Sequence, residues 1–346
     1  MRIIAAFDSF KGCLSSREIA DEVRRAVEET LPGSEVVEVA VADGGEGIID
    51  AVVDRLGGRV VEAVVSDPLG RPTLARYGIA GDLGIIEASQ ACGITLLRSE
   101  ERNPLLTTTR GVGELILDAI SNGCGRFIVG IGGSATNDGG RGMIEIEGFL
   151  EQAGRCSFTV ARDVDNPFIG PRGASRVFGP QKGASPADVE TLESRLTEYS
   201  KVILEETGVD VRNMPGAGAS GGLGGAFAAF LGAELKPGIE MVLDVIGFDS
   251  LLEGADLVFT GEGRSDAQTV HGKAPAGVLA HAMKQGIPVA LVSGAILPCP
   301  ELDSLGFTVM RAASPEGMPL EEAMMPATAR RNIHEAVAGI IAGIKR

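Results

Sequence analysis

The sequence predicts an α/β protein with two domains. One is a parallel-sheet domain assembled from discontinuous segments, and the other is an inserted α/β domain with a mixed sheet. Two observations predict this fold class. Four apolar runs rich in Ile and Val each end in a glycine-rich polar loop, which is typical of central strands of a parallel sheet. Short strands without intervening helices interrupt that pattern, and 346 residues are too many for one hydrophobic core.

The four loops are the first candidates for a site. In open parallel sheets, ligands bind beyond the carboxyl ends of the strands, so we expect the loops to converge on one crevice. Their glycines would let backbone N–H groups approach a ligand closely. Residues 2–7 precede the loop 8–12, residues 36–41 precede 43–47, residues 126–131 precede 132–140, and residues 256–260 precede 261–266.

The first elements predict a βαβα unit. After the strand at 2–7, Ser15 and Glu18 have the spacing of a capping box, and apolar residues follow at every fourth position up to residue 31. Pro32-Gly33 ends this helix. A strand at 36–41 and a helix at about 47–56 follow. This order implies a parallel sheet with right-handed crossovers.

Two stretches depart from this alternation and predict the second domain. The first contains short strands at 59–65, 73–79 and 84–88, and the second contains a strand at 157–164 and a long helix at 186–206. A helix at about 112–122 lies between the stretches, and alternating helices and strands resume after residue 240. We therefore predict one domain from 1–58, 104–143 and 238–346 and another from 59–103 and 144–237. We expect the active-site cleft between them.

Composition excludes several classes of partner. The net charge of −16 disfavours nucleic acid and anionic membranes, which are themselves polyanionic. No apolar stretch reaches membrane-spanning length, and the N-terminus lacks the basic start of a signal peptide. Five scattered cysteines without a C-x-x-C motif argue against a disulfide framework or zinc site and favour free thiols in a reducing cytoplasm. The oligomeric state stays open, a homo-oligomer included.

Known catalytic motifs are mostly missing from the sequence. Residues 130–135 fit the loose dinucleotide pattern G-x-G-x-x-A, but the match is weak in a chain with 49 glycines and lies mid-chain. A structural glycine turn is a stronger alternative there, and phosphate contact is favoured over both. The sequence contains no Walker P-loop, no protein-kinase H-R-D or D-F-G motif, and no G-x-S-x-G elbow.

Phosphoryl transfer needs positioned cations, a metal and a base, and the four loops offer all of them. A single acid after a strand is often only a helix N-cap, and for Asp43 or Asp138 alone that alternative is equally strong. Capping does not explain the accompanying cations. His271 is better explained as a loop hydrogen-bonding residue and Cys13 as a small buried residue. The candidate residues are the acids Asp8, Asp43, Glu46, Asp138, Glu262 and Asp266, the cations Lys11, Arg264 and Lys273, and the hydroxyls Ser9, Ser134 and Thr136.

Seven motifs along the chain carry a family resemblance: residues 8–12, 42–47, 103–108, 130–140, 178–183 and 216–224, and 261–264 with Asp266, Gln268, Thr269 and Lys273. On these motifs the chain resembles the bacterial glycerate kinase family from its first strand to its end. The resemblance implies ATP- and Mg²⁺-dependent phosphorylation of D-glycerate and a Rossmann-like domain beside a separate α/β domain. Relatives carry an additional segment after the third loop, whereas here Met143 leads almost directly into residues 144–148. That segment is absent either from this protein or from this sequence.

On this resemblance we predict a role for each candidate. Lys11 would neutralise charge on the transferred phosphoryl group, Arg264 would clamp the substrate carboxylate, and Asp266 would accept the hydroxyl proton. The loop at 134–140 would hold nucleotide phosphates. Asp43, Glu46 or Asp138 would position magnesium. The residues predicted to bind substrate or nucleotide are Asp8, Ser9, Gly44, Gly45, Gly132, Gly133, Ser134, Thr136, Asn137, Glu262, Gln268, Thr269 and Lys273.

The sequence leaves three alternatives open. The phosphorylated hydroxyl could be at position 2, which we favour, or at position 3, giving 3-phosphoglycerate. An NAD-dependent oxidoreductase acting on the same hydroxy acid is a second class of function. A non-catalytic sensor that closes around a ligand is a third, although the loops hold more acids and cations than a sensor needs.

Overall fold

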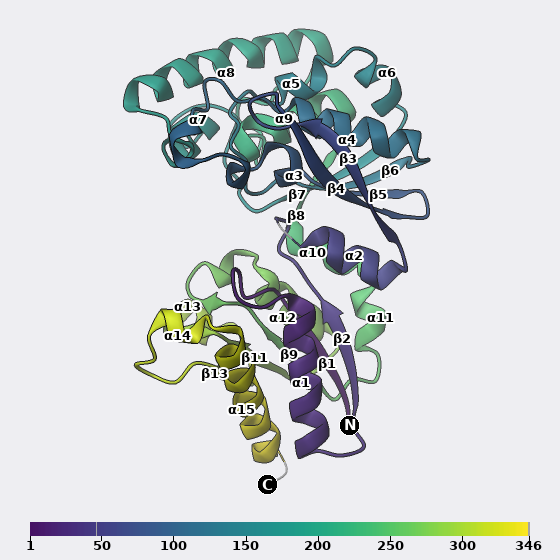
Figure 1. Cartoon of the computed structure of the whole chain (residues 1–346), viewed down its shortest axis with the longest axis vertical. Helices are drawn as coiled ribbons and strands as arrows, with labels where there is room; N and C mark the ends of the chain where they lie inside the picture. The colour runs from purple at the N-terminus through teal and green to yellow at the C-terminus, as the bar shows by residue number, and fades with distance from the viewer. Residues whose placement is uncertain (46, 345–346) are drawn as a thin grey trace. The chain divides into compact units, whose positions relative to one another are not determined.

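The chain forms two compact units in the computed structural model, which describes residues 1–45 and 47–344. Unit 1 comprises residues 1–43 and 242–346, and unit 2 comprises residues 44–241. Unit 2 is therefore a single continuous insertion into unit 1 (Figure 1). Among the described residues, no helix combines the length and the apolar composition that crossing a membrane requires.

Unit 1 is built on a parallel sheet of five strands in the order β13-β11-β9-β1-β2. β1 lies between β2 and β9, and Ile4 pairs with Val37 on one side and Val258 on the other. Such an order places the topological switch point at the carboxyl ends of β1 and β9, where ligands bind in open α/β sheets. The strands are β1 (Arg2–Phe7), β2 (Glu35–Ala40), β9 (Leu257–Gly261), β11 (Val289–Ser293) and β13 (Val309–Ala312), with a separate pair β10 (Arg264–Ser265) and β12 (Ala295–Ile296).

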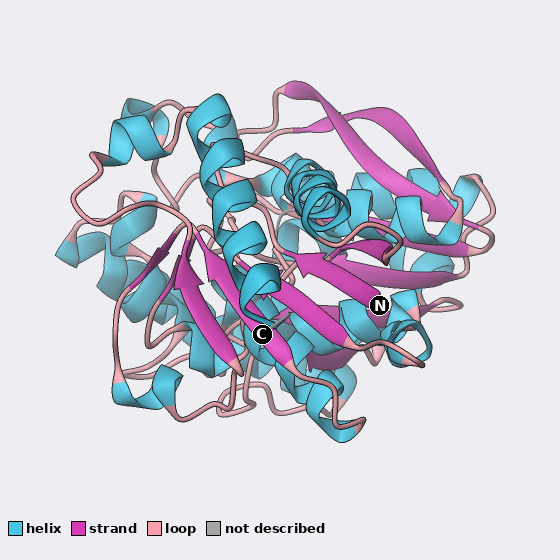
Figure 2. Ribbon diagram, turned by 90° about the horizontal axis from the view of Figure 1, so that it is seen from below, coloured by secondary structure: helices cyan, strands magenta, loops and turns pink. Residues whose placement is uncertain are grey.

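Helices cover both faces of this sheet (Figure 2). On one face, α1 and α15 pack with Ile19, Val23, Ile333 and Val337 against the strands, and α12 contacts the opposite face. The predicted capping box is confirmed: Ser15 Oγ accepts from the Glu18 N–H, and the Glu18 carboxylate accepts from the Ser15 N–H. The helices are α1 (Ser16–Thr30), α11 (Phe248–Leu252), α12 (Ala274–Lys284), α13 (Pro300–Asp303), α14 (Leu320–Ala323) and α15 (Pro326–Ile344), and α10 (Gly238–Ile246) begins in unit 2 and continues into unit 1.

Unit 2 is built on a mixed sheet of six strands in the order β3-β4-β5-β6-β7-β8. The first three strands, which the sequence predicted without intervening helices, are antiparallel neighbours, and the last four run parallel. This combination of a parallel sheet with a second, mixed sheet confirms the predicted fold class. The strands are β3 (Arg59–Ser66), β4 (Pro72–Ala80), β5 (Leu83–Glu87), β6 (Arg126–Gly130), β7 (Ser157–Arg162) and β8 (Glu234–Pro237).

Strand β6 differs from its predicted place. We predicted that residues 104–143 belong to the same domain as residues 1–58. In the structure, β6 pairs with β5 and β7, and residues 104–143 belong to unit 2. Residues 44–58 likewise belong to unit 2. An apolar run shows that a strand is buried in a parallel sheet but not which sheet receives it. Here Phe127 of β6 stacks on Phe158 of β7 with ring centroids 4.9 Å apart, and this contact lies inside unit 2.

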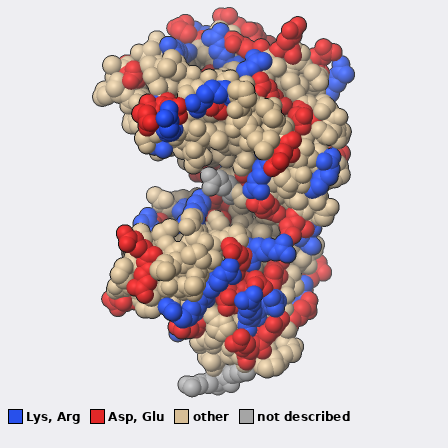
Figure 3. All heavy atoms as spheres, in the orientation of Figure 1, with Lys and Arg blue, Asp and Glu red and all other residues tan. Residues whose placement is uncertain are grey.

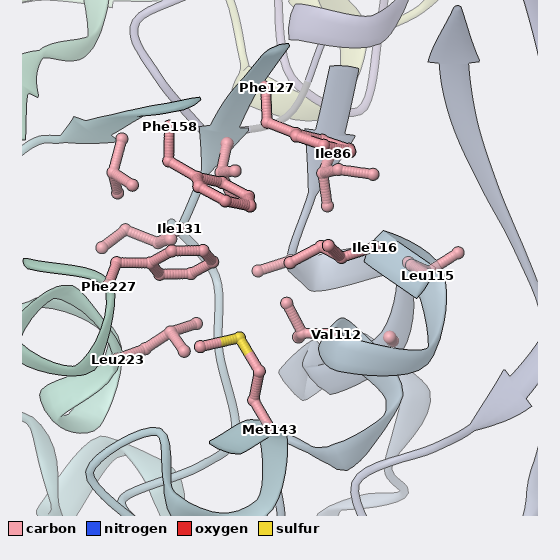
Figure 4. Close-up of a cluster of buried hydrophobic side chains, with 14 of the residues drawn as sticks. Ile86, Val112, Leu115, Ile116, Phe127, Ile131, Met143, Phe158, Leu223 and Phe227 are labelled. Carbon is pink, nitrogen blue, oxygen red and sulfur yellow. The ribbon is translucent and has the colours of Figure 1, made fainter. Parts of the chain in front are cut away.

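The core of unit 2 lies between its sheet and its central helices (Figure 4). Phe127 and Phe158 from the sheet face Phe227 of α9, and Val112 and Met143 extend the cluster. The helices are α2 (Ile48–Leu56), α3 (Ser89–Cys92), α4 (Arg110–Ser121), α5 (Arg141–Ile144), α6 (Phe149–Ala153), α7 (Ala174–Phe178), α8 (Pro186–Thr207) and α9 (Leu223–Leu231), with short 3₁₀ turns η3 (Pro180–Lys182) and η4 (Ala219–Gly222).

Candidate active site

A pocket of about 860 Å³ opens in unit 1 where β1, β2 and β9 end. This is the position at which a sheet of this order binds ligands. It brings together predicted residues from three of the four loops that we expected to converge, whereas the loop at 132–140 belongs to unit 2 and does not line this pocket. The predicted residues lining the pocket are Asp8, Ser9, Lys11, Asp43, Glu262, Arg264 and Lys273.

Asp8 directly follows β1 and is only 4% exposed. Its N–H donates to the Gly261 carbonyl (3.1 Å), which ties the end of β1 to the end of β9. Its Oδ1 accepts from the Ser9 N–H at 2.7 Å. Burial raises the pKa of Asp8 to about 7, and the nearby charge of Asp43 contributes further. The bond from Ser9 and the charge of Lys11 oppose this rise.

Glu262 directly follows β9, and a polar network holds it in place. Its Oε1 accepts from Thr269 Oγ1 (2.6 Å) and Ser265 Oγ (3.1 Å). Its Oε2 lies 3.4 Å from Lys273 Nζ, so the two side chains form an ion pair at the pocket wall. Thr269 is fully buried and therefore orients Glu262 from behind.

Arg264 and Asp266 interact with each other beside the pocket. Arg264 Nε lies 3.2 Å from Asp266 Oδ2, and Asp266 Oδ1 accepts from the Gln268 N–H at 2.9 Å. The Arg264 side chain is 63% exposed and lines the pocket, whereas Asp266, Gln268 and Thr269 are not among the residues that line it. In the predicted fourth loop, Glu262 and Arg264 therefore line the pocket, and Asp266 lies in the turn that supports it.

The acids that line the unit 1 pocket match the small number of carboxylates with which proteins usually bind Mg²⁺. Within residues 1–45 and 47–344, no three acid, histidine or cysteine side chains gather closely enough to hold a metal ion by themselves. Mg²⁺ usually keeps several waters and binds through one or two carboxylates together with substrate phosphates. Asp8 and Asp43 line the same pocket, and their mutual repulsion, which raises the pKa of Asp8, is what a cation would relieve. Glu46, also predicted as a metal ligand, lies outside the described residues.

Asp138, the third predicted metal ligand, lies in unit 2 and has a structural environment. Its carboxylate accepts from Thr109 N–H (2.8 Å) and hydroxyl (2.9 Å) and from the N–H groups of Gly140 and Gly142 (both 3.1 Å). Burial raises its pKa, and these bonds oppose the rise. This geometry favours a role in holding the loop and the start of α4 and α5 over metal binding.

The loop after β6 is likewise divided. Gly132, Gly133 and Ser134 line a second pocket of about 410 Å³ within unit 2. Thr136 and Asn137 are buried, and Asn137 Nδ2 donates to Ser175 Oγ at 3.0 Å. The two halves of the predicted phosphate loop therefore face different spaces, because Asn137 and Asp138 line a separate pocket of about 630 Å³ in unit 2.

Gly44 and Gly45 pack their backbones against this loop in unit 2. A Cβ on Gly44 would lie 2.7 Å from Gly238 Cα and 2.8 Å from Asp163 Oδ1, and Gly44 has φ of +105°. A Cβ on Gly132 would lie 3.0 Å from Gly45 Cα. Close backbone approach accounts for these glycines without a ligand.

Lys182 was not among the predicted site residues. It lies in η3 and lines the second pocket, and its Nζ donates to Ser134 Oγ (3.0 Å) and to the Thr136 carbonyl (2.7 Å). Burial lowers its pKa to about 8. Residues 178–183 were part of the family resemblance, but no chemistry in that motif pointed to this lysine as buried.

Comparisons with known proteins agree with the resemblance. The model of the glycerate kinase family matches residues 3–150 and 143–345, and the two matches overlap where the expected additional segment is absent. A "Glycerate 2-kinase" from Escherichia coli (strain K12) is 43% identical, with 86% of each chain covered. A "Glycerate kinase" from Bacillus subtilis (strain 168) is 41% identical, with 93% of each chain covered.

A solved structure gives the same result. The crystal structure of a candidate glycerate kinase 2 from Salmonella typhimurium LT2 matches with a TM-score of 0.88 and 38% identity, covering 100% of this chain and 98% of the other. Since the family model spans nearly the whole sequence and these two relatives exceed 40% identity, the chain is an enzyme of the glycerate kinase family.

Proposed function

We propose that this protein transfers the γ-phosphoryl group of ATP to the 2-hydroxyl of D-glycerate, with Mg²⁺ as the metal. Family membership supports the reaction, and the relative named glycerate 2-kinase supports the position. The observation that carries the proposal is the unit 1 pocket, where acids and cations from the ends of β1, β2 and β9 face one space. Phosphoryl transfer is catalysed chiefly by such positioned charges.

The cations of this pocket suit a triphosphate. Lys11, Arg264 and Lys273 line it, and Lys273 is oriented by its ion pair with Glu262. We propose that Lys11 neutralises the charge that develops on the transferred phosphoryl group. Apolar side chains, including Ile296 and Met318, line another part of the pocket and provide surface for a base.

The acids of the pocket suit the metal that accompanies the triphosphate. Asp8 and Asp43 would hold Mg²⁺ together with phosphate oxygens and water. When bound, the ion neutralises charge on the β- and γ-phosphates. Glu262 would keep Lys273 in place rather than bind the ion, because its Oε1 is occupied by two hydroxyl donors.

The location and partners follow from composition. We propose a cytoplasmic enzyme that acts on small molecules, in accord with the five scattered cysteines and the net charge of −16. On the face drawn in Figure 3, acidic and basic side chains are interspersed over both units. Many of them form local pairs, such as Arg24 with Glu28 and Glu38. That face does not offer the continuous basic surface that a polyanion requires.

Product analysis tests the reaction. Incubation with ATP, Mg²⁺ and D-glycerate should give ADP and 2-phosphoglycerate, identified by phosphorus NMR. A resonance of 3-phosphoglycerate instead would move the reaction to the other hydroxyl. Reduction of NAD by glycerate without ADP release would replace the kinase with an oxidoreductase.

Asp266 remains the proposed proton acceptor, and its substitution tests that role. In the structure its carboxylate is held by Arg264 and the Gln268 N–H, so acting as a base requires the pair with Arg264 to open. Asp266→Asn should lower kcat by about 10²–10⁴-fold, the usual contribution of a general base. The matched control is Asp303→Asn, an exposed acid of the same unit. Turnover of Asp266→Asn within a few fold of wild type would remove Asp266 from the chemistry.

Asp8 makes stability depend on pH and on metal. An aspartate of the unfolded chain ionises near pH 3.8, whereas the pKa of Asp8 in the folded protein is about 7. Between these values the folded state keeps a proton that the unfolded state has lost. The Asp8 contribution to stability therefore falls as pH rises from 4 to 7, by on the order of 3 kcal/mol in total.

Thermal unfolding of Asp8→Asn tests this dependence. In EDTA the variant should gain stability over wild type progressively between pH 4.5 and 8, while Asp303→Asn should follow wild type. Adding Mg²⁺ and ATP should stabilise wild type at pH 8 and leave Asp8→Asn nearly unchanged. A constant difference between the variant and wild type across this pH range would show that Asp8 does not retain its proton.

A further inference from the structure

The pocket of about 410 Å³ in unit 2, called the unit 2 pocket below, contains a buried cation whose hydrogen-bond acceptors are all neutral. Lys182 is 4% exposed, and the two acceptors of its ammonium group, Ser134 Oγ and the Thr136 carbonyl, are neutral. An ammonium group carries three donors, so one remains for another acceptor. Among the described residues, no carboxylate forms an ion pair with Lys182; the charge of Asp138 acts on it only beyond ion-pair distance, and that carboxylate already accepts four other hydrogen bonds. Burying a charge in this way is costly unless an anion compensates it.

Ser220 supplies a second unsatisfied group in the same pocket. It is the only residue other than glycine with a positive φ in the described chain, with φ of 55° and ψ of 39°. Glycine would adopt this conformation without strain, whereas serine does not. Compared with glycine, serine therefore contributes a hydroxyl group at the cost of backbone strain. That Oγ is buried and has no hydrogen-bond partner among the described residues. The backbone of the neighbouring Gly221 packs closely against the loop after β6. A Cβ on Gly221 would lie 2.0 Å from the Thr136 carbonyl oxygen, so a larger residue would not fit.

The unit 2 pocket differs from the unit 1 pocket in the charged side chains that line it. The unit 2 pocket is lined by one cation, Lys182, and one acid, Asp163, whereas three cations and several acids line the pocket of unit 1. A nucleoside triphosphate with its metal needs several cations and carboxylates. One cation, one carboxylate and two hydroxyls instead match a small monoanion that carries hydroxyl groups. The volume of about 410 Å³ is ample for such a ligand.

We propose that the unit 2 pocket is the hydroxy-acid site, with Lys182 binding the carboxylate of D-glycerate and Ser220 and Asp163 contacting its hydroxyls. This proposal rests on the proposed function and names the residues that hold its acceptor substrate. It replaces two expectations from the sequence. Arg264 no longer clamps the substrate carboxylate, and the first half of the loop after β6 binds glycerate rather than nucleotide phosphates.

Kinetic constants for the two substrates separate this site from a structural role. Lys182→Met should raise KM for D-glycerate by about 10- to 100-fold, the worth of a hydrogen bond to a charged group, and leave KM for ATP within about twofold. Arg264→Met should show the converse, with a raised KM for ATP. Lys201→Met, an exposed lysine of α8, is the matched control and should change neither constant.

Ser220→Gly keeps the proposal testable if Lys182→Met does not fold. Glycine relieves the positive φ, so the melting temperature should be unchanged or higher, while KM for D-glycerate should rise by about 2- to 10-fold. A raised KM for ATP with an unchanged KM for glycerate, in either variant, would overturn the assignment in favour of a nucleotide site. Unchanged constants for both substrates would overturn it altogether.

Equilibrium binding separates this proposal from the proposed function. If wild type releases no ADP with D-glycerate, the proposed function fails. Calorimetric titration of D-glycerate into wild type and Ser220→Gly then tests the pocket alone. Binding to wild type that is weakened in the variant supports the hydroxy-acid site. Equal affinity, or no binding to wild type, contradicts it.

Discussion

The parallel pairing of β1 with β9 is the contact on which the site in unit 1 depends. Its register aligns Phe7 with Gly261, so the next residues, Asp8 and Glu262, leave the sheet at the same edge. Gly261 permits this arrangement, because a Cβ there would lie 1.8 Å from the Val292 carbonyl oxygen of β11. A one-residue change of register would separate the two carboxylates and dismantle the pocket wall.

The unit 1 pocket and the unit 2 pocket favour ligands of opposite charge. In unit 1, buried Asp8 lies near Asp43 and Glu262, and this arrangement holds the pKa of Asp8 far above its usual range. In unit 2, buried Lys182 has only neutral acceptors, and its pKa is lowered. A cation relieves the first environment and an anion the second. A nucleotide with the proposed metal and a hydroxy acid are the two ligands of the proposed reaction, and each matches one of these two environments.

Much of unit 1 could be predicted from the sequence because local rules govern it. The capping box at Ser15, the buried strands and the acids directly after β1 and β9 follow from spacing and alternation along the chain. The placement of β6 could not be predicted, since an apolar strand fits either sheet until its long-range partners are known. The packing of Phe127 on Phe158 is such a partnership.

Part of the candidate site could likewise be predicted from the sequence, and part could not. Lys11, Lys273, Asp43 and Glu262 were recognised as polar residues beside glycine turns, and they do line one pocket. Burial could not be read from the sequence. Asp138 and Thr269 were predicted as site residues, and in the structure partly buried Asp138 accepts from the Thr109 N–H while buried Thr269 donates to Glu262. Lys182 was missed for the converse reason, because its importance lies in its burial without an anionic partner.

The assignment of the metal and nucleotide to unit 1 is tested most directly by a crystal structure with Mn²⁺ and a non-hydrolysable ATP analogue, in which the anomalous signal locates the manganese. We expect the metal within coordination distance of Asp8 or Asp43 and the phosphates against Lys11 and Lys273. Metal and phosphates beside Ser134 and Lys182 in unit 2 would contradict it.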